Sequence, residues 1–140
     1  NIKVILPEDH VVSLAFGDTQ NVSVTSGIDI PDDKLGLDIG PKTVEKIGQA
    51  LETVETVFWN GPMGVFEEPV FARGTIEVAK LIAQSKAVKL VGGGDSAAAI
   101  SQAGLEASFD FISTGGGATL EYLEGKSLPG LKVLEILERS

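Results

Sequence analysis

The sequence predicts an α/β fold in which a parallel β-sheet lies between layers of helices. Short apolar stretches rich in β-branched residues alternate with longer stretches of helical periodicity, the order expected when a helix connects each parallel strand to the next. Residues 56–59 lack the polar alternation of a half-exposed strand, which indicates burial on both faces. The 17 glycines of this 140-residue chain are clustered rather than scattered, and three clusters follow predicted strands. Clustered glycines are typical of turns where the backbone approaches a ligand closely.

The first forty residues predict three short strands and a loop. Residues 1–7 are typical of a strand that the sequence enters midway, and residues 10–14 and 22–25 are further extended candidates. Residues 28–39 are acidic and rich in turn-forming residues, so we expect a surface loop there.

A helix is predicted over residues 41–54. It begins with a proline, which is favoured at the first helical position because the N–H that proline lacks is not needed there. Apolar side chains then recur at intervals of three and four residues, which places them on one face of the helix. They are Val44, Ile47, Leu51 and Val54.

The rest of the chain continues the alternation, and we expect roughly four parallel strands in the core. A second helix over residues 71–84 turns Val78, Ala79, Leu81 and Ile82 inward. The tail from residue 128 onward carries five aliphatic side chains and needs a surface on which to dock: Leu131, Val133, Leu134, Ile136 and Leu137. The remaining elements are strands at residues 56–59, 87–91 and 109–113 and helices at residues 96–102 and 118–123.

The composition excludes several classes of function. A net charge of −9 disfavours a nucleic-acid binder of the basic-patch kind. No apolar run approaches the roughly 18 residues that a membrane span needs, and no signal-peptide pattern is present. The absence of cysteine excludes disulfides, thiolate nucleophiles and cysteine-based zinc sites. A catalytic triad or histidine metal cluster would have to be built around the single histidine, His10.

Two glycine clusters, residues 92–94 and 115–117, lead from a predicted strand directly into a helix. In an open parallel sheet, ligands bind at the edge where the strands have their carboxyl ends. A helix N-terminus offers unpaired N–H groups and a partial positive charge, and glycine lets an anion come close to them. One glycine triplet alone is often only a tight turn, but two in consecutive units favour a site for a polyphosphate or a transferring phosphoryl group.

Asp95 and Ser96 follow the first of these clusters. Either residue could be a helix cap. A carboxylate aimed into a phosphate site is repelled unless a divalent cation lies between them, so Asp95 is a candidate ligand of Mg²⁺. The Ser96 hydroxyl could donate to a phosphate oxygen.

Two standard motifs fit poorly. Residues 92–97 match the dinucleotide fingerprint in its Gly/Ala form, and Asp110 is the acidic residue expected about 20 residues further on, but it lies within a predicted strand. Residues 125–127 resemble the end of a Walker A loop, but Leu120 stands where the motif needs glycine.

Residues 59–67 leave a buried strand as a rigid loop with an amide, two glycines and a carboxylate. An apolar wall beside one carboxylate suits a nucleoside, with the base against Val65 and the ribose hydroxyls on Glu67. A surface loop with a packed Phe66 is the alternative that periodicity leaves open. We expect Trp59 to be a core residue rather than a platform for a ligand.

Four motifs together make the sequence closely similar to phosphoglycerate kinases. The resemblance covers nearly the whole chain, is firmest over residues 35–131 and is weakest over residues 9–33, where only Phe16 remains of a turn that the family usually has. The motifs occur in the family's order and spacing at residues 38–43, 59–67, 92–96 and 113–118.

The resemblance implies that this chain is the latter part of a larger domain. Phosphoglycerate kinases are two-domain enzymes of roughly three times this length; the N-terminal domain binds 3-phosphoglycerate, and the C-terminal domain binds the nucleotide. Residues 1–140 resemble the end of the C-terminal domain. The resemblance also implies that the domain is incomplete, because an earlier Gly-Gly-Ala-Lys turn is absent. The expected fold is thus a three-layer Rossmann-like α/β domain that lacks some strands.

The function that the resemblance implies is reversible phosphoryl transfer between 1,3-bisphosphoglycerate and Mg-ADP, which gives 3-phosphoglycerate and Mg-ATP. Gly36, Leu37 and Val65 would line the adenine pocket, and Glu67 would hold the ribose. Asp95 would approach Mg²⁺. Further nucleotide-binding candidates are Asn60, Pro62, Gly64, Gly93, Gly94, Asp95 and Ser96. The groups expected to act on the phosphoryl in flight are Gly94, Gly115, Gly116 and Gly117.

The expected partners are therefore ADP or ATP in this chain, and the phosphoglycerates through the missing domain. We expect a cytoplasmic, monomeric parent enzyme that binds neither nucleic acid nor membrane, and a fragment that is inactive alone. Two other functions stay open at this point. One is half of a nicotinamide-dependent oxidoreductase, and the other is a non-catalytic module that binds adenine nucleotides.

Overall fold

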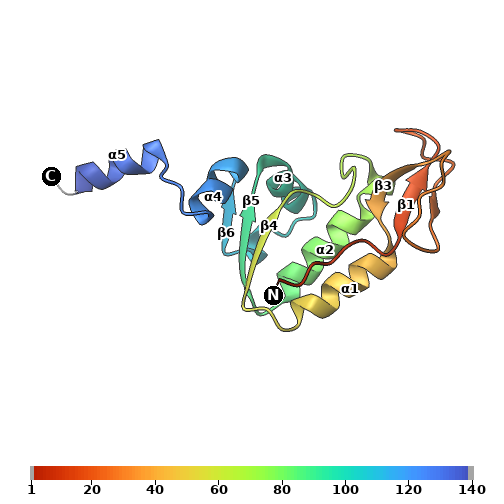
Figure 1. The fold of residues 1–140 in the computed structure, drawn as a ribbon, viewed down its shortest axis with the longest axis horizontal. Coiled ribbons are helices and arrows are strands. Elements are labelled where there is room, and N and C mark those ends of the chain that lie inside the picture. Colours follow the sequence, from red (N-terminus) through yellow and green to blue (C-terminus); the bar gives the residue numbers. More distant parts are fainter. Residues whose placement is uncertain (1, 139–140) are drawn as a thin grey trace.

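The computed structural model describes residues 2–138, which form two three-stranded sheets and the helices around them (Figure 1). One sheet is parallel and the other antiparallel. The strands of the antiparallel sheet are β1 (His10–Ser13), β2 (Ser23–Val24) and β3 (Leu35–Ile39). The strands of the parallel sheet are β4 (Thr56–Asn60), β5 (Val88–Gly92) and β6 (Phe111–Ser113).

The parallel sheet confirms the predicted α/β architecture. Its strands lie in the order β4-β5-β6, and helices flank it (Figure 1). The expectation of roughly four parallel strands is wrong for residues 2–138, where the structure has three. The helices are α1 (Pro41–Leu51), α2 (Arg73–Gln84), α3 (Gly94–Gln102), α4 (Gly116–Leu123) and α5 (Pro129–Glu138), with short 3-10 turns at Pro69–Phe71 and Glu106–Ser108.

The main hydrophobic core lies between the parallel sheet and α1, α2 and α3. Trp59 and Val91 enter it from the strands, while Val78 and Ile82 enter it from α2 as predicted. Trp59 is only 4% exposed, which confirms that it is a core residue. A second cluster joins the antiparallel sheet to the 3-10 turn that precedes α2.

The antiparallel sheet corrects the prediction of a surface loop over residues 28–39. Residues 35–39 form β3, which pairs with β1 in the order β2-β1-β3. Leu37, Asp38 and Ile39 are all buried. The acidic residue in this strand made it resemble a loop, but the folded chain buries that carboxyl and gives it hydrogen bonds.

The prediction of a strand over residues 1–7 is wrong, because residues 2–7 form no strand in the structure. Ile2, Val4 and Leu6 are largely exposed there. An apolar β-branched sequence becomes a strand only where a neighbouring strand accepts its hydrogen bonds, and no described strand lies in register with this segment. Residue 1 lies outside the described residues.

Helix α1 is held at its start by a carboxyl that lies far away in the sequence. Asp9, 1% exposed, accepts hydrogen bonds from the backbone N–H groups of Lys42 and Thr43 (3.0 and 2.9 Å). Thr43 Oγ1 also donates to Asp9 Oδ1 at 2.7 Å. Burial acts to raise the pKa of Asp9, but these hydrogen bonds outweigh it and hold the pKa below its ordinary value. The helix ends at Leu51, so the prediction that Val54 belongs to its apolar stripe is wrong.

The tail forms α5, which extends away from the rest of the molecule (Figure 1). Leu131, Val133 and Leu134 are exposed, so the expected docking of the tail is not found for these residues. The side chains of Ile136 and Leu137 lie outside the described part. No helix within residues 2–138 combines the length and apolarity needed to cross a membrane.

Candidate functional site

The three glycine-rich loops leave the parallel sheet at the same edge. Asn60, Gly92 and Ser113 are paired in register at the carboxyl ends of β4, β5 and β6. Each loop therefore begins beside the next, as the sequence predicts for a ligand-binding edge. The geometry thus brings Asn60 together with both glycine triplets.

The two glycine triplets touch each other through their backbones. Gly93 donates its N–H to the carbonyl of Ser113 at 2.9 Å. A Cβ atom added at Gly116 would lie 2.8 Å from Gly93 Cα and 2.8 Å from Asn60 Oδ1, closer than real Cβ contacts. Gly93 itself has a φ of 98°, a left-handed conformation that favours glycine. Gly116 lets the start of α4 approach Gly93 this closely, and the positive φ of Gly93 lets the chain turn there into α3.

Both helices begin within the glycine triplets, two residues earlier than predicted. Helix α3 starts at Gly94 and α4 at Gly116. The first-turn N–H groups of a helix have no acceptor within the helix, so Gly94, Asp95, Gly116 and Gly117 present donors at the sheet edge. Gly115 differs, because its N–H donates to Ser113 Oγ at 3.2 Å. The prediction that Gly115 offers its N–H to a phosphoryl group would require this bond to break.

Ser96 is held beneath the surface. It is fully buried, and its Oγ accepts a hydrogen bond from the Gly61 N–H at 2.6 Å. The hydroxyl therefore fastens the loop after β4 to the first turn of α3. A phosphate bound at this helix start would meet the backbone N–H of Ser96 more readily than its hydroxyl.

A hollow of about 470 Å³ lies between the loop after β4 and the start of α3. Five of its lining residues are those predicted from the sequence: Pro62, Gly64, Val65, Glu67 and Asp95. Three lining residues were not predicted as site residues: Phe16, Phe66 and Glu68. Phe16 comes from the segment between β1 and β2, and its side chain is 69% exposed. The sequence did contain a signal for Phe16, because it is an aromatic residue retained in the segment where the resemblance to the family is weakest.

Gly36 and Leu37 lie beside this hollow without lining it. Leu37 accepts a hydrogen bond from the Val65 N–H at 2.9 Å, so the β3 strand and the loop are joined there. The Leu37 side chain is 7% exposed and packs in the second core cluster, which Val65 also contacts. A Cβ atom added at Gly36 would lie 2.7 Å from Ile30 Cδ1, so the flexible Ile30 side chain covers this glycine.

The acidic residue of the dinucleotide fingerprint has another position. Asp110 Oδ2 accepts a hydrogen bond from the backbone N–H of Lys89 at 2.7 Å. Lys89 is near the start of β5, so this carboxylate lies toward the amino ends of the strands, away from the glycine loops. The hypothesis of a nicotinamide-dependent oxidoreductase therefore loses the acidic residue, Asp110, on which it depended.

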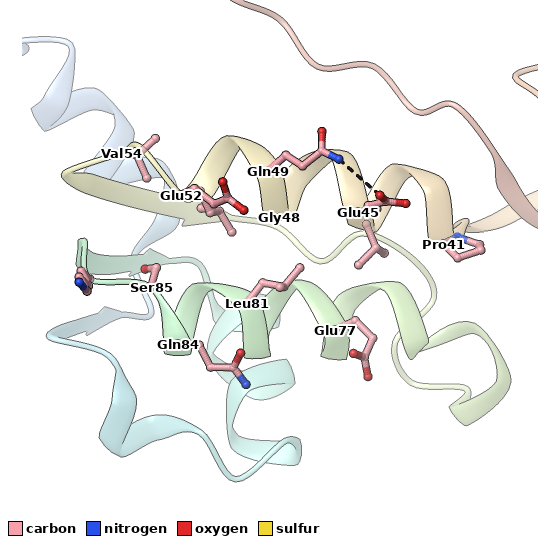
Figure 2. Close-up of a pocket in the computed structure, with 13 residues that line it drawn as sticks. Pro41, Glu45, Gly48, Gln49, Glu52, Val54, Glu77, Leu81, Gln84 and Ser85 are labelled. Carbon is pink, nitrogen blue, oxygen red and sulfur yellow. Dashed lines mark hydrogen bonds between the residues drawn. The ribbon is translucent and has the colours of Figure 1, made fainter.

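A larger hollow, of about 820 Å³, lies between α1 and α2 (Figure 2). Leu81 of α2 points across it toward Gly48 of α1. Glu45, Glu52 and Glu77 stand along it. None of the predicted site residues lines it, and it extends to the residues that precede β4 and β5. Its size therefore gives no reason to place the function there.

Asp38 was not predicted as a site residue, although it begins the first motif. Its carboxyl is 4% exposed and accepts hydrogen bonds from the backbone N–H groups of Gly74 (2.6 Å) and Ile39 (2.9 Å). Burial raises the pKa of Asp38 to about 6, and the two hydrogen bonds limit this rise. Because the carboxyl in the unfolded chain ionises near 3.8, the folded state binds its proton more tightly between these two values.

We expect the stabilising contribution of protonated Asp38 to be complete below about pH 3.8 and lost as the pH rises through 6. A pKa rise of this size corresponds to about 3 kcal/mol. As the pH rises from 4 to 7, the free energy of unfolding of Asp38→Asn should therefore increase relative to that of the parent protein by up to about this amount. The reason is that the parent loses the stabilising proton, whereas the variant has none to lose. Chemical denaturation of both proteins across this range checks the prediction. A difference that does not change with pH would contradict it.

No group of three or more His, Cys, Asp or Glu side chains that could hold a metal ion occurs among residues 2–138. Asp95 is exposed at the first turn of α3, and the hollow contains two further carboxylates, Glu67 and Glu68. One carboxylate at the start of a helix, that of Asp95, fits Mg²⁺ that is held mainly by phosphate oxygens and water, which is the usual manner in phosphoryl-transfer sites. It does not fit a metal held by the protein alone.

These features define a class: an α/β domain with glycine-rich loops and helix N-termini at the carboxyl edge of a parallel sheet. The model of the phosphoglycerate kinase family matches residues 1–126. The chain belongs to the phosphoglycerate kinase family.

Relatives agree with this membership. Phosphoglycerate kinase of Bdellovibrio bacteriovorus is 52% identical over 134 residues, which are 96% of this chain and 33% of that protein. That of Lactobacillus delbrueckii subsp. lactis is 55% identical over 92% of this chain and 32% of its own length. The structure of phosphoglycerate kinase from Coxiella burnetii matches with a TM-score of 0.84 at 37% identity, over 92% of this chain and 33% of that one. The one from Pyrococcus horikoshii OT3 gives 0.78 at 38% identity, over 93% and 32%. The chain thus spans about a third of the length of its relatives.

Proposed function

We propose that this chain forms the nucleotide-binding part of a phosphoglycerate kinase. The whole protein would transfer a phosphoryl group between 1,3-bisphosphoglycerate and Mg-ADP, giving 3-phosphoglycerate and Mg-ATP, as a monomeric glycolytic enzyme of the cytoplasm. The observation that carries the proposal is the hollow of about 470 Å³, in which the loop after β4 faces Asp95 at the start of α3. The phosphoglycerates would bind to a domain outside residues 1–140.

The hollow offers surfaces for both parts of a nucleoside. Pro62 and Val65 supply an apolar wall suited to a base, and the exposed Glu67 supplies acceptors suited to ribose hydroxyls. Leu37, which follows Gly36 in β3, holds the backbone of Val65 through its carbonyl. The base would therefore lie near β3, and the phosphates would extend toward Asp95.

The phosphates would then meet the N-termini of α3 and α4. The N–H groups of Gly94, Asp95, Gly116 and Gly117 are donors fixed before any ligand arrives, and their helix dipoles favour negative charge. Because α4 begins directly beside Gly93, a phosphoryl group leaving the nucleotide would remain within reach of both helix ends. In this proposal no side chain acts as a covalent nucleophile, and the work is positioning and charge stabilisation. Bound Mg²⁺ would neutralise charge on the phosphate oxygens.

Replacing Asp95 by Asn tests the role of the metal. We expect the variant to bind Mg-ADP at least tenfold more weakly, while its affinity for metal-free ADP stays the same or improves. The reason is that the lost charge would face Mg²⁺ in one case and the phosphates directly in the other. Isothermal titration of the full-length protein with ADP, with and without Mg²⁺, measures both affinities. An equal loss for both ligands would show that Asp95 has no role toward the metal; a helix cap is already excluded, because Gly93 is the N-cap of α3 and no side chain caps this helix.

Replacing Glu67 by Gln tests the placement of the ribose. We expect weaker binding of ADP by about threefold to tenfold, because hydrogen bonds to a charged acceptor are stronger than those to an amide. Affinity for inorganic tripolyphosphate, which has no ribose, should remain unchanged. Competition titrations with the two ligands measure this difference. A similar loss for both ligands would mean that the loop has a structural role.

A further inference from the structure

The buried carboxyl of Asp38 lies where three parts of the molecule meet. It belongs to β3, it contacts the first turn of α2, and it lies against the loop that follows β4. That loop, residues 61–68, supplies most of the lining of the proposed nucleotide hollow. Asp38 itself does not reach the hollow. Any influence that it has on a ligand must therefore pass through its neighbours.

The first neighbour is the start of α2. The residue that precedes this helix, Ala72, has no polar side chain to cap it, and the buried Gly74 N–H is paired with Asp38 Oδ2 instead. A carboxylate at this place also complements the positive end of the helix dipole. Without Asp38, the Gly74 N–H would be left buried and unpaired, which is costly.

The second neighbour is the loop itself. A Cβ atom added at Gly64 would overlap the Asp38 side chain, so the loop backbone lies directly against the carboxyl. Thr75, which follows Gly74 in α2 and is fully buried, accepts hydrogen bonds at its Oγ1 from the N–H groups of Met63 and Gly64 (3.1 and 3.3 Å). The carboxyl that holds α2 thus also holds, through Thr75, the backbone of the loop.

We propose that Asp38 is a positioning residue: its carboxyl fixes the first turn of α2 against β3, and this sets the position of residues 62–67 as the wall of the hollow. Its effect on nucleotide affinity rests on the proposed function, whereas its effect on the loop does not. A side chain of this size with an acceptor oxygen, rather than an apolar one, is required at the junction, because the Gly74 N–H needs an acceptor and the backbone of Gly64 leaves room for no larger group.

Hydrogen exchange and ligand binding in the full-length protein test this proposal together. In Asp38→Ala we expect the amides of Met63, Gly64 and Val65 to exchange about tenfold faster or more, and the Kd for Mg-ADP to rise by about tenfold. Asp38→Asn keeps the volume and one acceptor oxygen for Gly74, so it should show much smaller changes at the same amides. If the Ala variant does not fold, Thr75→Val tests the same link, because it keeps the side-chain volume and removes the acceptor of the Met63 and Gly64 N–H groups. These amides should then exchange about tenfold faster, and unchanged exchange would overturn the proposal.

Asp9→Ala is the matched control, because Asp9 is an equally buried carboxyl that caps α1 rather than α2. It should lower the melting temperature without faster exchange at residues 63–65 or weaker Mg-ADP binding. If Asp38→Ala behaves like this control, the positioning role is wrong. If the loop loosens and the Kd stays unchanged, the link to the ligand is wrong. If the loop loosens but the parent protein binds no Mg-ADP, the positioning of the loop is supported, and the proposed function fails.

Discussion

Purified residues 1–140 are expected to give only background activity in a coupled assay with ATP and 3-phosphoglycerate, whereas under the proposed function the full-length protein should turn both over. The residues that line the described hollow include the carboxylates of Glu67, Glu68 and Asp95 and no Lys or Arg. Three negative side chains around a polyphosphate oppose its binding unless cations compensate. In the proposed site, the groups of this chain that would face the phosphates are backbone N–H donors.

Those donors are too weak to replace side-chain cations. A helix dipole contributes about 0.3–1 kcal/mol near a surface, whereas a positioned arginine on a transferring phosphoryl accelerates transfer by roughly 10³- to 10⁵-fold. Without a second domain closing over the site, water also stays in it and weakens each remaining electrostatic contact. Both effects lower the activity, so we expect the turnover of residues 1–140 to be at least a thousandfold below that of the full-length protein.

The reference for this assay is the full-length protein, at the same concentration as the fragment. Circular dichroism should show that the fragment is folded before it is called inactive. Activity of the fragment within tenfold of the full-length protein would show that the catalytic groups are contained in residues 1–140, and the proposal of a half-site would be wrong.

Gly116→Ala is expected to lower the free energy of unfolding by about 3 kcal/mol and the turnover of the full-length protein by about a hundredfold. The added methyl would meet the backbone of Gly93 and the amide oxygen of Asn60, both at 2.8 Å. A backbone inside a sheet edge cannot move aside cheaply, so α4 must shift away from α3. A displacement of about 1 Å at donors that act on a phosphoryl group is enough for a loss of this size.

Gly117→Ala is the matched control for the stability part of this prediction. It changes the next residue in the same helix, but a Cβ atom there would meet nothing within 4 Å. Because alanine favours a helix over glycine by up to about 1 kcal/mol, this variant should be as stable as the parent or slightly more stable. Thermal unfolding of both variants measures the difference. Equal stability of the two would contradict the close contact between the glycine triplets.

The parallel sheet and its helices could be predicted well from local pattern. The strands at residues 56–60 and 88–92 could be predicted from short runs rich in apolar residues, and α2 shows its buried face in the spacing of Val78 and Ile82. The expected burial of residues 56–59 on both faces is wrong, because only Trp59 is buried and Thr56 is exposed. The composition of a strand and the periodicity of a helix are encoded in neighbouring residues, so they can be recognised without knowing distant contacts. The boundaries were less accurate, because α3 and α4 begin within glycines that have low helix propensity of their own.

Elements that depend on distant partners were predicted poorly. Residues 2–7 have the composition of a strand but find no neighbour in the described structure, whereas β3 contains an acidic residue and still forms a buried strand. In both cases the outcome depends on pairing across many residues. Phe16 and Asp38 were missed for the same reason. Phe16, from the segment between β1 and β2, lines the hollow, and Asp38 of β3 lies against the loop after β4, so both contacts join parts of the chain that are far apart in the sequence.

By itself, the sequence determined the α/β class, the three glycine loops and the family to which their motifs belong. These features are encoded in short stretches, where composition and spacing are sufficient. Only the tertiary structure decided that Gly93 and Gly116 touch, that Ser96 Oγ accepts a hydrogen bond from the Gly61 N–H, and that Asp38 binds the first turn of a helix 36 residues away. The physical reason is that close packing and the pairing of buried polar groups join residues from separate elements, and spacing along the chain does not show which of them meet.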